Sequence, residues 1–127
     1  MSVTKPEEMN AAFADAYNSG DVERLLDLYE PGAMLAPFPG QRAVGKAAIR
    51  DALLGLLALN GRMVSRNNYC MQVGEIALLQ GEWRLSFTGE GGESVEQASR
   101  SAEVVRRQEH GSWLYVVDHA FADDETP

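Results

Sequence analysis

Residues 113–121, "WLYVVDHAF", read as a β-strand that a carboxylate interrupts. The first five residues are aromatic, aliphatic or β-branched, and these types fit a pleated, half-buried surface. Asp118 and His119 then follow, before Ala120 and Phe121 resume the apolar run. We interpret the carboxylate as facing a small-molecule pocket rather than the packed core.

Three further strands precede this one, and glycine-centred turns join all four. The predicted strands are "RMVSRNNYCMQV" (62–73), "EIALLQGEWRLSF" (75–87) and "SVEQASRSAEVVRRQ" (94–108), and the turns are "GE", "TGEGGE" and "EHG". Short glycine turns between strands are typical of antiparallel hairpins. The second half of the chain therefore predicts a mostly antiparallel sheet.

Three helices are predicted in the first half of the chain. "TKPE" indicates the start of the first helix, with Thr4 as its N-cap and Glu7 completing a capping box. "NSGD" ends that helix, and Asp21 is the predicted N-cap of a second one that carries Tyr29 on its buried side. A short strand and a bent loop, "AMLAPFPGQRAVG", lead to the third helix, "KAAIRDALLGLLAL". Helices first and strands last predict an α+β fold, with helices covering one face of a curved sheet.

Length and composition indicate one globular domain over residues 1–127. The formal net charge is -8 at pH 7. Such a surface repels phosphate backbones and anionic lipid, so neither nucleic acid nor a membrane is an expected partner. The chain shows no signal-peptide pattern and no long apolar stretch, so we expect a cytoplasmic protein. Two histidines and one cysteine, scattered along the chain, predict no metal site and no internal disulfide.

The predicted strand at 75–87 carries apolar side chains on both of its faces. Leu79, Trp83, Leu85 and Phe87 share one parity, and Ile76 and Leu78 share the other. A sheet covered only on its helix side should alternate more cleanly. The apolar outer face predicts a homodimer built sheet against sheet, unless a bulge resets the strand parity.

Three segments together carry a resemblance to a known family. Two helices joined by "YNSGD", the stretch "LYEPGAMLAPFPGQRAVGKAAI" and a sheet ending in "GSWLYVVDHAF" resemble the nuclear transport factor 2-like superfamily, above all its SnoaL-like and ketosteroid-isomerase-like small bacterial proteins. The resemblance implies a cone-shaped, cystatin-like roll with three N-terminal helices on a curved sheet, a pocket between them, and usually a dimer. Members include isomerases, dehydratases, epoxide hydrolases, polyketide cyclases and domains without known chemistry, so the fold leaves the reaction open.

The ketosteroid isomerase site matches this chain only in part. The isomerases place their carboxylate base just before a Pro-Phe pair, and the matching "LAPFPG" offers Ala36 or Pro37. Their oxyanion-binding tyrosine matches Phe13, which has no hydroxyl to donate. Their buried carboxylic acid, which donates a hydrogen bond, matches Glu103. The resemblance therefore implies that proton shuttling on a steroid is lost here.

Glu103 and Asp118 are the candidate catalytic residues. If Gly111 closes the last hairpin as in the isomerases, the two acids become near neighbours on antiparallel strands, and the matching family positions line the pocket. Two carboxyl groups that close in a partly dry cavity resist ionising together, so one keeps its proton above its ordinary pKa. A protonated and an ionised carboxyl group are the equipment for general acid–base chemistry.

Structural roles compete with this interpretation. Glu103 could instead pair with Arg84, Arg100 or Arg106, and the second acid could accept a hydrogen bond from Tyr115.

Four further residues are candidates for the pocket wall: Phe13, Tyr17, Trp83 and Val116. Tyr17 lies one helical turn after Phe13 and could supply the hydroxyl that Phe13 lacks. Large aromatic side chains are also the ordinary content of a core.

These residues support two functions. The first is a non-catalytic pocket protein that lacks the isomerase base and binds a small apolar or oxygenated molecule. The alternative is a cofactor-independent isomerase, cyclase or dehydratase-like enzyme in which Glu103 and Asp118 form the acid–base pair. A pure dimerisation domain, with a filled cone, is a third possibility.

Overall fold

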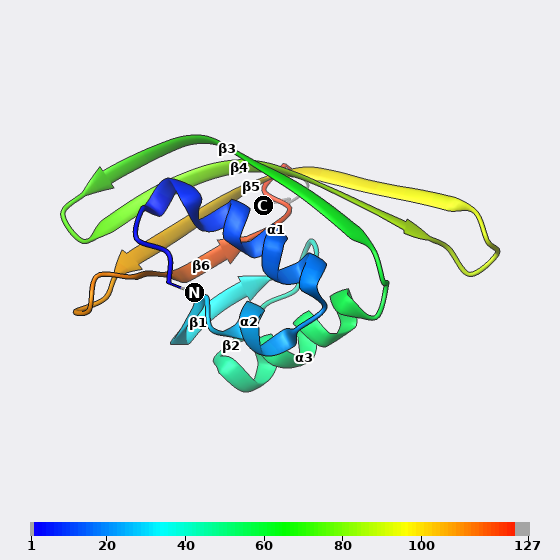
Figure 1. Ribbon diagram of the computed structural model, residues 1–127, viewed down its shortest axis with the longest axis horizontal. Coiled ribbons are helices and arrows are strands. Elements are labelled where there is room, and N and C mark those ends of the chain that lie inside the picture. Colours follow the sequence, from blue (N-terminus) through cyan, green and yellow to red (C-terminus); the bar gives the residue numbers. More distant parts are fainter. Residues whose placement is uncertain (1, 124–127) are drawn as a thin grey trace.

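The helices of the protein lie on one face of a six-stranded sheet in a computed structural model that describes residues 2–123 (Figure 1). In chain order the elements are a 3-10 helix at Pro6–Glu8, α1 at Met9–Ser19, α2 at Val22–Leu26, β1 at Tyr29–Ala36, β2 at Ala43–Val44, α3 at Lys46–Leu57, β3 at Arg62–Val73, β4 at Ile76–Thr88, β5 at Ser94–Arg107 and β6 at Trp113–His119. The strands lie in the order β2-β1-β6-β5-β4-β3, and the pairing is antiparallel except between β1 and β6. The predicted α+β class, with three helices on a curved and mostly antiparallel sheet, is confirmed.

A local sequence signal sets the N-terminus of α2. The Asp21 carboxylate accepts a hydrogen bond from the Glu23 N–H at 2.9 Å, as an N-cap residue does. The predicted capping box at Thr4 is wrong. The chain makes a 3-10 turn first, and neither that turn nor α1, which begins at Met9, has a side-chain cap.

Tyr29 also departs from its predicted place. The second helix ends at Leu26, and Tyr29 opens β1 instead of continuing the helix. It pairs with Tyr115 of β6 and is fully buried. Burying a large aromatic side chain in the sheet outweighs the helical spacing that the sequence suggests.

The core lies between the helices and the concave face of the sheet. Figure 1 shows the long strands β3, β4 and β5 arching over α1, while α2 and α3 lie beside β1 and β2. Among the largest fully buried side chains are Met9, Leu25 and Ile49 of the helices and Trp113 of β6. The sheet and the helices therefore meet along an apolar interior, and the functional cavity opens within it.

A β-bulge in β6 decides which of its side chains face this interior. Residues 105 and 104 of β5 pair with Tyr115 and Val117, so Val116 is an extra residue between them. One extra residue reverses the alternation of the strand beyond it. Tyr115 and Asp118 consequently both face the concave side and are both buried, although they are three residues apart.

The opposite face of the sheet carries an exposed apolar row. Met71, Leu78, Val104 and Val117 are successive cross-strand partners on β3, β4, β5 and β6. The exposed fractions of Met71 and Leu78 are 62% and 41%, while Leu79, which points to the other side, is fully buried. No helix in the described part of the chain is long and apolar enough to cross a membrane.

We propose that a second copy of the chain covers this row. Leu78→Asp should convert a dimer to a monomer, because a charge would be buried in an apolar contact without a partner. Light scattering after size exclusion at micromolar concentration measures the mass. Val44→Asp, at an exposed position of β2 outside the row, is the matched control and should leave the mass unchanged. A monomeric wild-type protein would contradict the proposal.

Candidate functional site

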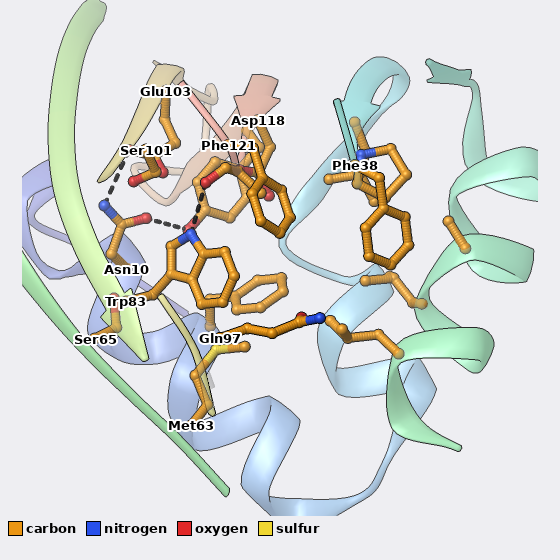
Figure 2. Close-up of a pocket in the computed structure, with 18 residues that line it drawn as sticks. Asn10, Phe38, Met63, Ser65, Trp83, Gln97, Ser101, Glu103, Asp118 and Phe121 are labelled. Atoms are coloured by element: carbon orange, nitrogen blue, oxygen red, sulfur yellow. Dashed lines mark hydrogen bonds between the residues drawn. The ribbon is translucent and has the colours of Figure 1, made fainter. Parts of the chain in front are cut away.

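A cavity of about 70 Å³ lies between α1, α3 and the concave face of the sheet. Its wall is mostly apolar, with the aromatic side chains Phe13, Phe38, Trp83 and Phe121. Figure 2 shows Asn10, Ser101 and Glu103 together at one end, next to Asp118, while Phe38 lies on the far side of Trp83 and Phe121. Phe38 is 40% exposed, so the cavity reaches the surface at this side chain.

Glu103 and Asp118 lie directly opposite each other on β5 and β6. The turn between these strands contains Gly111, whose φ of 96° is in the left-handed region that favours glycine. Opposed side chains on antiparallel strands have Cβ atoms about 4.5–5.5 Å apart. Both acids line the cavity, and their exposed fractions are only 3% and 6%.

No residue of the cavity wall carries a cation that could neutralise this carboxyl pair. The three arginines that could have done so pair with other acids: Arg84 with Glu96, Arg100 with Asp123 and Arg106 with Glu30. The residues that line the cavity include no lysine, arginine or histidine. The pair must therefore reduce its charge by keeping a proton.

Three hydrogen bonds hold the carboxyl groups in place. The Tyr29 hydroxyl donates to Asp118 Oδ2 at 2.5 Å. Asn10 Nδ2 donates to Glu103 Oε1 at 3.0 Å, and the Tyr115 hydroxyl donates to Asn10 Oδ1 at 2.8 Å. Ser101 also forms a side-chain hydrogen bond with Glu103.

Burial and mutual repulsion shift the pKa values of the two acids. Burial, followed by the nearby charge of Asp118, raises the pKa of Glu103 to about 8. Burial raises the pKa of Asp118 to about 6, although the hydrogen bond from Tyr29 and the nearby charge of His119 oppose this shift. Near neutral pH the pair therefore retains one proton, and the hydrogen bond from Tyr29 to Asp118 favours that proton on Glu103, which leaves one acidic donor and one basic acceptor in the cavity.

The predicted wall residues divide into two groups. Phe13 and Trp83 line the cavity, and the Trp83 indole N–H donates to the Ala120 carbonyl at 2.6 Å. Tyr17 is not among the lining residues, because its hydroxyl lies at the end of α3 and donates to the Leu56 carbonyl at 2.9 Å. This placement corrects the expectation that Tyr17 would replace the missing hydroxyl.

Val116 also lies outside the cavity wall. The prediction assumed a regular strand, in which Val116 shares a face with Asp118. The bulge at Val116 breaks that parity and brings Tyr115 to the wall instead.

Three residues of the hydrogen-bond network around the acids were not predicted as site residues: Asn10, Tyr29 and Tyr115. Asn10 had a visible signal, since it lies three residues before Phe13, where helical spacing puts a polar side chain on the apolar stripe. Tyr29 was assigned to a helix, and the bulge concealed Tyr115.

The chain matches a family model described as the SnoaL-like domain over residues 10–116. Solved structures with the same fold include a ketosteroid isomerase-like protein from Erwinia carotovora atroseptica, with 20% identity, a TM-score of 0.74 and coverage of 85% of each chain. An NTF2-like protein with a cystatin-like fold from Novosphingobium aromaticivorans has 22% identity and a TM-score of 0.76, over 93% of this chain and 80% of that one. Among curated proteins no match was found.

A third structure is a proposed dehydratase of the NTF2-like family from Streptomyces avermitilis, with 20% identity and a TM-score of 0.73, over 87% of this chain and 88% of that one. At these identities the likeness shows the cystatin-like fold, and the chemistry must come from the site itself.

The carboxyl pair should make stability fall as the pH rises. The folded protein holds protons that the unfolded chain releases from about pH 4 upward, so the free energy of unfolding decreases until the pH passes the raised pKa of Glu103, about 8. The loss should be on the order of a few kcal/mol, since one pKa unit corresponds to about 1.4 kcal/mol. Glu103→Gln should remove the decrease in the free energy of unfolding between pH 6 and 8, as measured by urea unfolding at a series of pH values.

Glu90→Gln, at an exposed position in the turn between β4 and β5, is the control and should keep the wild-type slope. An identical slope in the wild type and Glu103→Gln would mean that Glu103 does not hold the proton.

Proposed function

The chain belongs to the SnoaL-like domain family, and from this premise we propose that it binds a small, uncharged, oxygen-bearing apolar molecule in the cavity. The observation that carries the proposal is the opposed and buried carboxyl pair of Glu103 and Asp118 in an otherwise mostly apolar cavity. A concave apolar site with a few convergent polar groups and shifted pKa values is the usual form of a small-molecule site. The apolar wall holds the body of the ligand, and Glu103 and Asp118 bind its polar group.

The charge of the site supports an uncharged ligand. A carboxylate or phosphate would meet the ionised Asp118 with no lysine, arginine or histidine in the wall to compensate. A charge removed from water without a partner is strongly disfavoured. A neutral oxygen that accepts a hydrogen bond from Glu103 meets no such penalty.

The size of the cavity supports a compact ligand. A buried water needs about 10–15 Å³ on this measure, so a cavity of about 70 Å³ has room for roughly five waters or one small ring. A steroid is much larger than that. Two features therefore argue against a steroid isomerase: the small cavity, and the absence of a carboxylate from Ala36 and Pro37, the positions that match the isomerase base.

A second candidate function is acid–base catalysis, which the separated pKa values of Glu103 and Asp118 favour. A base that is ionised and an acid that is protonated at the same pH are what concerted proton transfer requires. Asp118 would take a proton from the carbon next to a carbonyl group, while Glu103 donates to the carbonyl oxygen. Isomerase, cyclase and dehydratase-like reactions share this step, and it requires no cofactor.

Two matched probes test the binding proposal at pH 7. Cyclopentanone should raise the melting temperature with increasing concentration, because it stabilises the folded state that binds it. Cyclopentanecarboxylate, with the same ring and a negative charge, should produce no shift. Ala52→Trp should abolish the cyclopentanone shift, because Ala52 lines the cavity from α3 and a large side chain fills it.

Equal shifts of the melting temperature by the two probes, or a cyclopentanone shift that persists in Ala52→Trp, would place binding outside the cavity. No shift from cyclopentanone at any concentration up to its solubility would contradict the proposed ligand class.

Exchange of the α-hydrogens of cyclopentanone in D₂O, followed by proton NMR, tests the catalytic alternative. The wild type should accelerate the exchange, and Asp118→Asn should lose about 10²- to 10⁴-fold of the rate, the usual contribution of a general base. An exchange rate equal to that of buffer, in a protein that binds the ketone, would reject catalysis and retain binding.

A further inference from the structure

The starting point of this inference is a backbone carbonyl beside the bulge of β3. Asn67 and Tyr69 flank the extra residue of that bulge, and Asn67 Nδ2 donates to the Tyr69 carbonyl oxygen at 3.1 Å. A carbonyl oxygen accepts hydrogen bonds and never donates them. The amide of Asn67 therefore has only one orientation, with Oδ1 at its other end.

The orientation of Asn67 determines that of Asn10. Asn67 Oδ1 lies 3.3 Å from the nearest atom of the Asn10 amide. Because Oδ1 is an acceptor, the Asn10 atom that faces it must be the donor Nδ2. Asn10 Oδ1 then faces the Tyr115 hydroxyl, which donates to it at 2.8 Å. Both contacts are satisfied by the same orientation of the amide, and the reversed one would bring two acceptors together.

The orientation of Asn10 in turn selects between the two oxygens of Glu103. The second hydrogen of Asn10 Nδ2 points to Glu103 Oε1 at 3.0 Å, so Oε1 must accept. A protonated carboxyl group has one hydroxyl oxygen and one carbonyl oxygen. Ser101 also reaches this group, but a hydroxyl both donates and accepts, so it adapts to the proton and does not select its place.

We propose that Asn10 is a positioning residue that holds the acidic hydrogen of Glu103 on Oε2, from which it can be donated to an acceptor oxygen of a ligand in the cavity. This inference rests on the proposed function for its ligand, but not for its geometry. The ligand class that it selects has a carbonyl, ether or epoxide oxygen at this end. An ammonium or amide N–H would bring a donor against the Glu103 hydroxyl.

The packing around Asn10 supports a site built for this amide. Gly81 of β4 lies beside it, and a Cβ atom there would come within 2.8 Å of Asn10 Nδ2 and 3.0 Å of Ser101 Oγ. The groups that face Glu103 are Ser101 from its own strand, Asp118 and Tyr115 from β6, Tyr29 from β1 and Asn10 from α1. All buried side-chain polar atoms in the described residues have a hydrogen-bond partner.

Infrared spectroscopy of protein with ¹³C-labelled glutamate reads out this hydrogen bond without any ligand. The carbonyl stretch of protonated Glu103, identified by its loss in Glu103→Gln, should move to higher wavenumber in Asn10→Leu, because Oε1 loses its donor. The pKa of Glu103 should also rise further in this variant, since the Asn10 hydrogen bond favours the ionised form.

Asn18→Leu is the matched control. Asn18 lies on the same helix and joins it to β3 through the N–H and carbonyl of Met63, but it does not contact Glu103. A purely structural role for Asn10 predicts the same unshifted band in both variants. An unshifted band in Asn10→Leu, or an equal shift in Asn18→Leu, would overturn the proposal. If Asn10→Leu does not fold, Tyr115→Phe is the second variant, because it removes the hydroxyl that fixes Asn10 Oδ1. This variant should broaden the Glu103 carbonyl band, and an unchanged band would also overturn the proposal.

The proposed ligand binding and the proposed role of Asn10 can be rejected independently of each other. Cyclopentanone should bind several-fold more weakly to Asn10→Leu than to Asn18→Leu, because the acidic hydrogen of Glu103 is then no longer confined to Oε2. A shifted band without ketone binding would reject the proposed function alone. Ketone binding with an unshifted band would reject only the role of Asn10.

Discussion

Two acids share one mostly apolar cavity whose wall carries no lysine, arginine or histidine, and the chemistry of the site depends on this constraint. Glu103 and Asp118 are opposed across β5 and β6, and the arginines of the neighbouring strands form ion pairs with other acids. Repulsion and burial make the doubly ionised state unfavourable, so the pair retains a proton near neutral pH. The difference between a donor and an acceptor then arises from the environment alone, since both side chains are carboxylic acids.

Irregular features of the sheet complete the site. The bulge at Val116 brings Tyr115 to the same face as Asp118, and the bulge in β3 places the Tyr69 carbonyl where it orients Asn67. A regular β6 would turn either Tyr115 or Asp118 away from the cavity. The helices contribute less polar chemistry: α1 supplies Asn10, and α3 supplies apolar wall.

The architecture was largely predictable from the sequence, because glycine turns and apolar periodicity are local signals that agree with the final fold. The opposition of Glu103 and Asp118 followed from the last hairpin and from the family resemblance. The local environment of the acids was not predictable in the same way. Tyr29 carries a helical spacing that burial in the sheet overrides, and Val116 was assigned to the wall because no residue type marks the bulge. Contacts between distant segments, such as Asn10 with Glu103, leave only an indirect trace, a polar residue on an apolar stripe.

Membership of the SnoaL-like family agrees with this arrangement and leaves the chemistry to the carboxyl pair. The most direct measurement is a ¹³C NMR titration of the side-chain carboxyl carbons of Glu103 and Asp118 in the wild-type protein. We expect two separate steps, one near pH 6 carried mainly by Asp118 and one near pH 8 carried mainly by Glu103. Titration of both groups in the range of ordinary exposed carboxyl groups, about pH 4, would contradict the account.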